Sequence, residues 1–274
     1  MEKVRLTGGE PFARKGFAEF LERLRAAHPA LDIRVTTNGT LIGPHIRTLK
    51  AIGLNAVNLS LDTFDRDKFE RVTGRDLFHK VRENMDALLD AGIPFKLNAV
   101  AMRGFNDDEL PAFVDYAMRH PVDVRFIEFM PMGEGTRWSD SCFWPAPDIL
   151  DAVKGLVSVA PVEQGQRSGG PARLYALSGP DGPALGASAL ITPLSSHFCT
   201  DCNRLRITSD GALRTCLFDD REYRLCNALR HPRLGIEAVR RIVTLATREK
   251  PIGARLLERR RNAVAQRRMT AIGG

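Results

Sequence analysis

The feature that most restricts the fold is an alternation of short apolar runs with helical patterns in the first half of the chain. Five runs rich in β-branched and other apolar residues have the length of buried strands. They cover residues 3–6, 32–36, 56–61, 94–101 and 122–129. Between them, apolar residues recur at three- and four-residue spacing over 14–27, 43–52, 76–91 and 107–119. Strands that alternate with helices predict an α/β fold, a parallel sheet with helices on its outer face.

The sequence changes character after residue 130, where loops rich in Gly and Pro replace the alternation. Two short strands and one helix are predicted there, near residues 173–177, 204–208 and 236–248. We therefore expect two regions, residues 1–132 and residues 133–274.

The composition excludes several classes of protein. With 43% hydrophobic and 27% charged residues among 274, the chain is too apolar for a disordered protein. It has no apolar run long enough to span a bilayer and no apolar segment typical of a secretory signal in its first residues, so we expect a cytoplasmic protein without membrane association. The net charge is +7, but the last twenty residues hold six arginines and one glutamate. Because few tyrosines and tryptophans accompany this charge, a nucleic-acid surface is not indicated.

Five cysteines in such a chain indicate metal binding or catalysis rather than disulfides. Cys199 and Cys202 form a CxxC pair, and a strand near residues 204–208 followed by a turn predicts a hairpin that returns Cys216 beside them. Three thiolates suit zinc or an iron–sulfur cluster with one open iron. A zinc site formed by the three cysteines together with His197 is the alternative. The cysteines without a partner at ligand spacing are interpreted as buried thiols; they are Cys142 and Cys226.

Polar side chains recur where the predicted strands end. Gly8 and Gly9, within Arg5-Leu-Thr-Gly-Gly-Glu-Pro11, let a ligand approach the backbone because neither carries a Cβ. Four further stretches place polar residues at or near strand ends, namely residues 36–39, 60–62, 96–98 and 125–130. Ligands of parallel α/β sheets bind outside the carboxyl ends of the strands, so these residues predict a site on one rim. Individually, they also suit helix caps and turns.

Arg204 and Arg206 follow the CxxC pair and lie two residues apart in a predicted strand, so they point to the same face. Two guanidinium groups beside a metal site suit a phosphate or a carboxylate ligand. The alternative is a pair of solvent-facing arginines on an edge strand, with Leu205 and Ile207 on the opposite face.

Taken in order, these motifs resemble the MoaA family, the radical SAM GTP 3′,8-cyclases of molybdenum cofactor biosynthesis. The matching segments are residues 5–11, 36–39, 58–62, 125–130, 170–175 and 198–206, with the terminal Gly273 and Gly274. The resemblance implies an α/β fold that is an incomplete TIM-like (β/α)6 radical SAM barrel lacking its first strand–helix unit. It also implies a C-terminal α+β region with a basic tail, which carries a cluster held by three cysteines and binds GTP.

The resemblance further implies the reaction and the partners. Members of the family convert GTP to 3′,8-cyclo-7,8-dihydro-GTP with a radical made from S-adenosylmethionine at one 4Fe–4S cluster, while a second 4Fe–4S cluster binds GTP. The expected partners are GTP, S-adenosylmethionine and the pathway protein MoaC, the cyclic pyranopterin monophosphate synthase. A homodimer is a candidate assembly.

Matching the motifs residue by residue implies the role of each side chain. The implied metal ligands are Cys199, Cys202 and Cys216. The residues implied to contact S-adenosylmethionine are Gly9, Ser60 and Met130. The residues implied to contact GTP are Arg5, Thr36, Lys96, Arg125, Arg204, Leu205 and Arg206. Those implied to act in the reaction are Arg204, Arg206, Gly273 and Gly274, the two glycines forming a tail without side chains that reaches the active site.

One feature departs from the family pattern. The CxxxCxxC sequence that holds the S-adenosylmethionine cluster precedes the Gly-Gly-Glu motif in the family, and this chain has no cysteine before Cys142. We therefore expect an N-terminally truncated member that binds GTP and one cluster but is inactive alone. Two alternatives stay open, a non-catalytic remnant that binds GTP or a cluster, and a zinc-stabilised nucleic-acid-binding protein.

Overall fold

The computed structural model describes residues 2–132, 136, 138–163, 171–200, 202–253 and 255–256. The chain divides into two compact units. The first unit comprises Met1–Phe129 and Asp140–Ser195, and the second comprises Met130–Ser139 and Ser196–Gly274. Each unit is described by itself below.

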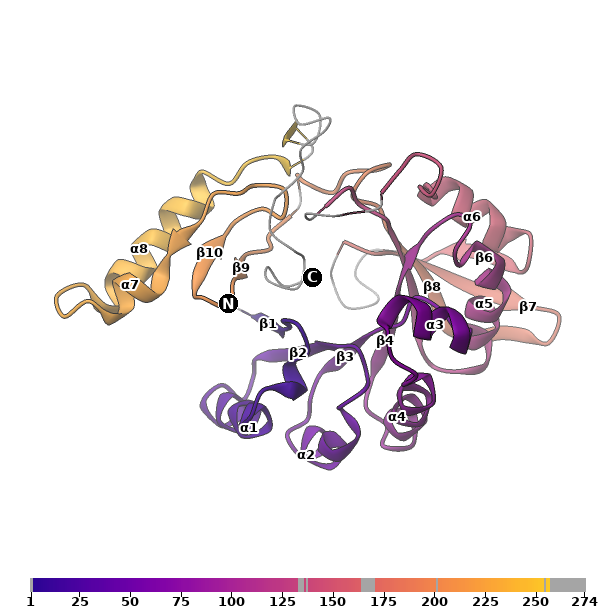
Figure 1. Cartoon of the computed structure of the whole chain (residues 1–274), viewed down its shortest axis with the longest axis horizontal. Coiled ribbons are helices and arrows are strands. Elements are labelled where there is room, and N and C mark those ends of the chain that lie inside the picture. The colour runs from indigo at the N-terminus through magenta and orange to yellow at the C-terminus, as the bar shows by residue number, and fades with distance from the viewer. Residues whose placement is uncertain are drawn as a thin grey trace. The chain divides into compact units, whose positions relative to one another are not determined.

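In the described part of the first unit, eight strands form one sheet in the order β1-β2-β3-β4-β5-β8-β7-β6 (Figure 1). The strands are β1 (Lys3–Leu6), β2 (Asp32–Thr37), β3 (Ala56–Ser60), β4 (Phe95–Ala101), β5 (Asp123–Glu128), β6 (Ser158–Pro161), β7 (Arg173–Gly179) and β8 (Gly182–Ile191). Strands β1 to β5 and β8 run parallel to one another, and β7 and β6 continue the sheet antiparallel. Parallel strands that follow one another in sequence need a crossover, and helices provide it here.

The helices of the first unit pack on one face of this sheet. They are α1 (Phe17–Ala27), α2 (Ile46–Ala51), α3 (Arg66–Thr73), α4 (Phe78–Asp90), α5 (Leu110–Arg119) and α6 (Ala146–Lys154). Leu21 of α1, Met85 of α4 and Phe113 of α5 are fully buried against the strands in one core. Figure 1 shows α1, α2 and α4 along the outer side of β1 to β4. The predicted α/β fold, with parallel strands alternating with helices, is confirmed.

The sixth parallel strand, β8, is absent from the sequence prediction. It is rich in Gly and Ala rather than in β-branched residues. The reason is close packing: a Cβ at Gly186 would lie only 2.2 Å from the carbonyl oxygen of Val122. Because β8 and β7 join the first unit, residues 140–195 fold with the sheet, and the compact units do not divide at residue 132 as expected.

The described residues of the second unit form three short strands followed by helices. The strands β9 (Arg206–Ile207), β10 (Ala212–Arg214) and β11 (Tyr223–Arg224) form an antiparallel sheet with β10 in the centre. Helices α7 (Leu225–Arg230) and α8 (Gly235–Arg248) follow, and Ala246 of α8 packs on Leu213 and Leu225. No helix among the described residues of either unit has the length and apolar character needed to cross a membrane.

Candidate functional site

The two faces of the parallel sheet differ in chemistry because successive residues of a strand point to opposite sides. On the outer face, Val35, Leu59 and Leu97 are fully buried beneath the helices. On the opposite face, the residues that alternate with them are mostly polar or charged. The sheet therefore has one face of mostly polar residues, which is not the face that packs into the apolar core.

The strand register aligns this polar face into two rows across the sheet, which we call the polar rows. The first row is Thr36, Asn58, Lys96 and Asp123, and the second row is Ser60, Asn98 and Arg125. Arg5 and Arg34 pair in register on the same face, in β1 and β2. The structure thus brings together five residues implied by the resemblance that lie far apart in sequence.

The placement of Lys96 and Arg125 differs from the sequence prediction. Both were expected near carboxyl ends of strands, but Lys96 is the second residue of β4 and Arg125 the third of β5. They reach the site because they lie on the polar face, whereas Thr36 and Ser60 lie at or next to the ends of β2 and β3, as expected.

The cations of the polar rows are buried close to one another. Lys96 Nζ lies 3.0 Å from Asp123 Oδ2, and both side chains are 12% exposed. Burial and the charge of Arg125 nevertheless lower the pKa of Lys96, against the opposing effect of Asp123. Burial also lowers the pKa of Arg125 to about 10, and the charges of Arg5 and Arg34 act in the same direction. Crowded, desolvated cations of this kind favour an anionic ligand.

Three buried polar atoms of these rows have no hydrogen-bond partner among the residues that the structure describes. They are Oδ1 of Asn58, Oδ1 of Asn98 and Nε of Arg125. Leaving such an atom unpaired costs free energy, so native proteins usually satisfy it with water or a ligand. The polar rows therefore have unused capacity to bind a polar ligand.

A pocket opens beside the first row, at the amino ends of the strands. Its volume is about 370 Å³, and Arg34, Lys96 and Asp123 line it.

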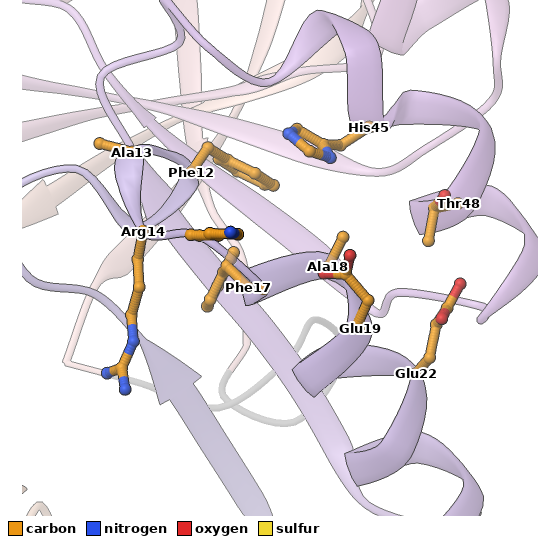
Figure 2. A pocket seen from close by; sticks show the side chains of 11 residues that line it. Phe12, Ala13, Arg14, Phe17, Ala18, Glu19, Glu22, His45 and Thr48 are labelled. Carbon is orange, nitrogen blue, oxygen red and sulfur yellow. The ribbon is translucent and has the colours of Figure 1, made fainter.

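Figure 2 shows a different pocket of about 540 Å³ at the start of α1, where the ring of His45 stacks on that of Phe12 at 5.1 Å. No residue predicted from the sequence lines that second pocket, so we place the chemistry at the polar rows.

The Gly-Gly-Glu motif is tied to the end of β2 through its glutamate. The carboxylate of Glu10 accepts hydrogen bonds from Oγ1 of Thr37 at 2.8 Å, the backbone N–H of Asn38 at 2.8 Å and that of Phe12 at 3.1 Å. Gly9 beside it is open, since a Cβ there would meet no atom within 4 Å. The motif therefore has a structural glutamate and an accessible backbone next to it.

In the second unit, the hairpin of β9 and β10 lies between the CxxC pair and Cys216, as predicted. A Cβ at Gly253 would lie 2.8 Å from Sγ of Cys216 and 3.6 Å from Sγ of Cys199, so both thiols face this glycine. Burial raises the pKa of Cys216, and negative charge on Cys199 and Cys202 raises it further. Among the described residues, no three side chains of His, Cys, Asp or Glu already stand in the arrangement of a metal site.

Cys202 has a cationic environment of its own. Nζ of Lys250 lies 3.4 Å from its Sγ and also donates to the carbonyl oxygens of Cys202 and Arg204. Burial opposes ionisation, but hydrogen bonds from Arg204 and the charges of Arg204 and Lys250 lower the pKa of Cys202 to about 7. A thiol of this kind is a ready metal ligand, because metals bind the thiolate.

The two arginines of the hairpin are turned inward. Arg204 and Arg206 are half-buried, whereas Leu205 and Ile207 are 38% and 64% exposed. The guanidinium of Arg204 lies over the ring of Phe198 at 4.9 Å, and burial lowers the pKa of Arg206 to about 10. The alternative of two solvent-facing arginines above a packed Leu205 and Ile207 is therefore wrong.

The remaining sequence predictions fall in different places. Met130 packs with Met132, Phe218 and Cys216 in a small apolar cluster of the second unit. Gly273 and Gly274 lie outside the described residues, as does the arginine-rich segment from residue 257 onward. His197, the fourth ligand of the zinc alternative, is exposed.

Several residues of the site were missed by the sequence analysis. Arg34 and Asp123 join the polar face only through strand register, and Lys250 and Gly253 reach the cysteines from a distant part of the chain. The alternation of β2 and β5 is the signal that would have revealed the first two. No spacing rule reveals the last two.

The sequence matches the models of two families along its length. The one described as "Radical SAM superfamily" matches residues 1–117, and the one described as "Molybdenum Cofactor Synthesis C" matches residues 122–256.

Curated relatives resemble the whole chain. A GTP 3′,8-cyclase of Alkaliphilus oremlandii is 40% identical over 276 residues, which cover 100% of this chain and 82% of that protein. A GTP 3′,8-cyclase of Pelotomaculum thermopropionicum is 39% identical with the same coverage. Among solved structures, a domain of a pyruvate-formate lyase-activating enzyme from Bacteroides vulgatus is similar at a TM-score of 0.44 with 14% identity, over 56% of this chain and 91% of that chain.

Proposed function

The chain belongs to the GTP 3′,8-cyclases, the radical SAM enzymes of molybdenum cofactor biosynthesis, and we propose that its polar rows bind the triphosphate of GTP while its cysteine-bearing unit holds a 4Fe–4S cluster. The observation that carries this proposal is a group of buried cations beside three polar atoms, on Asn58, Asn98 and Arg125, that have no hydrogen-bond partner among the described residues. The family uses S-adenosylmethionine and a 4Fe–4S cluster to supply the radical chemistry that joins C3′ to C8 of GTP.

The first unit would bind the anionic end of GTP. A triphosphate carries roughly four negative charges and is bound best by several cations in fixed positions. Lys96 and Arg125 lie on the same face of neighbouring strands, and Arg5 adds a third charge close enough to affect the pKa of Arg125. Thr36, in the row of Lys96, would donate its hydroxyl to the same ligand.

S-adenosylmethionine would be held by Gly9, Ser60 and Met130. The open backbone at Gly9 supports this assignment, because a carboxylate or ammonium group needs close approach to main-chain atoms. Ser60 ends β3 in the second polar row, beside the unpaired amide oxygen of Asn98. Met130 would supply an apolar, polarisable thioether for the adenine ring.

Cys199, Cys202 and Cys216 would hold the C-terminal cluster. Two of the thiols converge on Gly253, where any larger residue would fill the space beside them. Lys250 stabilises the thiolate of Cys202. Three protein ligands leave one iron open, and the inward-facing Arg204 and Arg206, with Leu205 between them, would bind GTP there. The terminal Gly273 and Gly274 would complete the active site.

No CxxxCxxC sequence, which would hold the second cluster of the family, occurs among the 274 residues, so we derive no step through that cluster. We place the protein in the cytoplasm, with GTP and S-adenosylmethionine as ligands and MoaC as the protein that consumes the product.

Anaerobic reconstitution followed by metal analysis tests the proposal. One cluster gives about four irons per chain, and two clusters give about eight. Calorimetric titration of the same sample with GTP, and with ATP as a control, should show binding of GTP that needs the iron. Stoichiometric zinc with no iron and no GTP binding would instead support the zinc-stabilised alternative.

A further inference from the structure

The pocket at the amino ends of the parallel strands is bordered by short side chains. Ala56, Pro94 and Pro121 line it, from β3 and from the segments that lead into β4 and β5. Ala56 lies two residues before Asn58 in β3, so it is on the polar face of the sheet. Because these side chains are small or closed into a ring, space remains at this end of the face. The cavity of about 370 Å³ is in the size range of pockets for small ligands.

Arg34 brings a buried positive charge to this pocket. The residue is 6% exposed, lines the pocket and lies two positions before Thr36 in β2, on the polar face. Burial lowers the pKa of Lys96, and the charges of Arg125 and Arg34 lower it further. Burial also lowers the pKa of Arg125 to about 10, in the same direction as the charges of Arg5 and Arg34. Arg34 therefore belongs to the same cluster of cations as Lys96 and Arg125, although the family resemblance assigns it no role.

The guanidinium of Arg34 is held in one orientation by Asp32. Its Nε donates a hydrogen bond to Oδ1 of Asp32 at 2.9 Å, and its Nη2 donates to Oδ2 at 2.8 Å. Two parallel bonds of this kind fix both the position and the plane of the group. They use one edge of a group that has five N–H donors. A ligand that binds Arg34 therefore does not have to order a long, flexible side chain first, which favours affinity.

We propose that this pocket holds the outer phosphates of GTP and that Arg34 is a further phosphate-binding residue. The inference rests on the proposed function, in which Lys96 contacts the triphosphate. Because Lys96 belongs to the first polar row and also lines the pocket, an anion bound at that row can extend to Arg34. Asp123, 3.0 Å from Lys96, orients that ammonium group as Asp32 orients Arg34. The planar guanidinium of arginine is suited to phosphate oxygens, which it binds in pairs.

A purely structural role is the alternative, in which Arg34 only pairs with Asp32. Arg34→Lys distinguishes the two roles, because lysine keeps a positive charge beside Asp32 but lacks the planar fork that binds a second anion. Arg66 provides a matched control in the same unit. Its Nε donates to Oδ1 of Asp76 at 2.8 Å and its Nη2 bonds to Oδ2, but it is exposed on α3 and does not line this pocket. Arg66→Lys therefore makes the same change outside the pocket.

The first test titrates inorganic tripolyphosphate into the full chain by calorimetry, because this probe lacks the base and the sugar. For Arg34→Lys we expect the Kd for tripolyphosphate to rise about tenfold, while Arg66→Lys changes it less than about twofold. Equal affinity of wild type and Arg34→Lys, or no binding to wild type, would overturn the inference. If Arg34→Lys does not fold by circular dichroism, Arg34→Gln combined with Asp32→Asn, which removes both charges of the pair, takes its place. Arg66→Gln combined with Asp76→Asn is then the control.

A second titration, of the iron-loaded chain with GTP and with GMP, separates failure of this inference from failure of the proposed function. Arg34→Lys should weaken GTP binding about tenfold and GMP binding less than about twofold, because GMP lacks the outer phosphates. If wild type binds tripolyphosphate through Arg34 but does not bind GTP, the proposed function fails and the pocket remains an anion site. If wild type and Arg34→Lys bind GTP equally, or if GTP and GMP are weakened alike, the inference fails while the proposed function stands.

Discussion

The two units hold their charged groups by different means. In the first unit, Lys96 and Arg34 lie on parallel strands, and each has a carboxylate partner at hydrogen-bond distance, Asp123 and Asp32. In the second unit, the thiols lie on loops beside strands of only two or three residues. The first arrangement is maintained by a sheet ladder without any ligand, whereas the thiols repel one another as soon as they ionise.

The contrast between the two units indicates which part of the site depends on its ligand. The carboxylates beside the cations of the polar rows stabilise them before a triphosphate arrives. Burial raises the pKa of Cys216, and the charges of the other two thiols raise it further, so ionising Cys216 beside them is unfavourable. A bound cation would remove that repulsion, because metal binding stabilises the thiolates and so the local fold. We therefore expect metal to order the second unit and to leave the first unchanged.

The largest expected effect is the loss of a cluster ligand. Cys202→Ala should reduce iron after reconstitution from about four per chain to nearly none, since a cluster held by three thiolates does not survive on two. Cys226→Ala is the matched control, because Cys226 packs beside Gly211, away from the other cysteines. Iron analysis and absorbance near the cluster bands measure the outcome. Equal loss in both variants would show that the ligand assignment is wrong.

The next effect concerns the first unit. Lys96→Ala should weaken GTP binding by about 30-fold, roughly 2 kcal/mol, because a charge-assisted contact to phosphate is lost. Iron loading should not change, since the second unit holds the cluster by itself. Lys80→Ala is the control, because Lys80 is exposed and pairs with Glu83 on the outer helix α4. Calorimetry with GTP measures both variants. A loss of iron in Lys96→Ala would remove the distinction between the two units.

The sequence predicted the first unit better than the second for a physical reason. Alternation of apolar residues is repeated in every strand and helix of the sheet, so the parallel α/β fold follows from local patterns. It failed at β8, where close approach to Val122 demands Gly186 instead of a β-branched residue. The polar rows needed the register of neighbouring strands, which no single segment contains. Asn58 and Asn98 lie in segments that the sequence analysis singled out, residues 58–62 and 96–98, but no role was predicted for either residue.

The second unit could be predicted only where ligands lie close together in sequence. The CxxC pair and the hairpin before Cys216 follow from spacing and turn chemistry. Lys250 and Gly253 lie beside the thiols because of the tertiary fold, and no local sequence pattern predicts this.

A smaller effect distinguishes the cysteines of the metal-free protein. The pKa of Cys202 is lowered to about 7 by Arg204 and Lys250, whereas that of Cys216 is raised by burial. At pH 7, iodoacetamide should therefore alkylate Cys202 about tenfold faster than Cys216, because the thiolate is the reactive form. Lys250→Met should reduce this difference. Mass spectrometry of peptides after short exposure measures it, and equal rates would show that the cations near Cys202 do not act on its thiol.

The smallest expected effect tests the ion pairs that prearrange the polar face. Burial opposes ionisation of Asp32, but the hydrogen bond and charge of Arg34, with the charge of Lys3, lower its pKa below 3.8. A carboxyl whose pKa is lower in the folded state stabilises the fold above its unfolded pKa, and this stabilisation is lost as the pH falls through the folded value.

Asp32→Asn should therefore lower the free energy of unfolding by about 1 kcal/mol at pH 7, and the difference should shrink once the pH falls below about 4. Urea unfolding at pH 7, 5 and 3 measures it, with Asp151→Asn as the control, because Asp151 lies in an exposed pair with Lys154. A difference that stays constant at all three pH values would mean that Asp32 supports the sheet through packing rather than charge. The polar face would then depend on its ligand as the cysteines depend on metal, and the contrast between the two units would disappear.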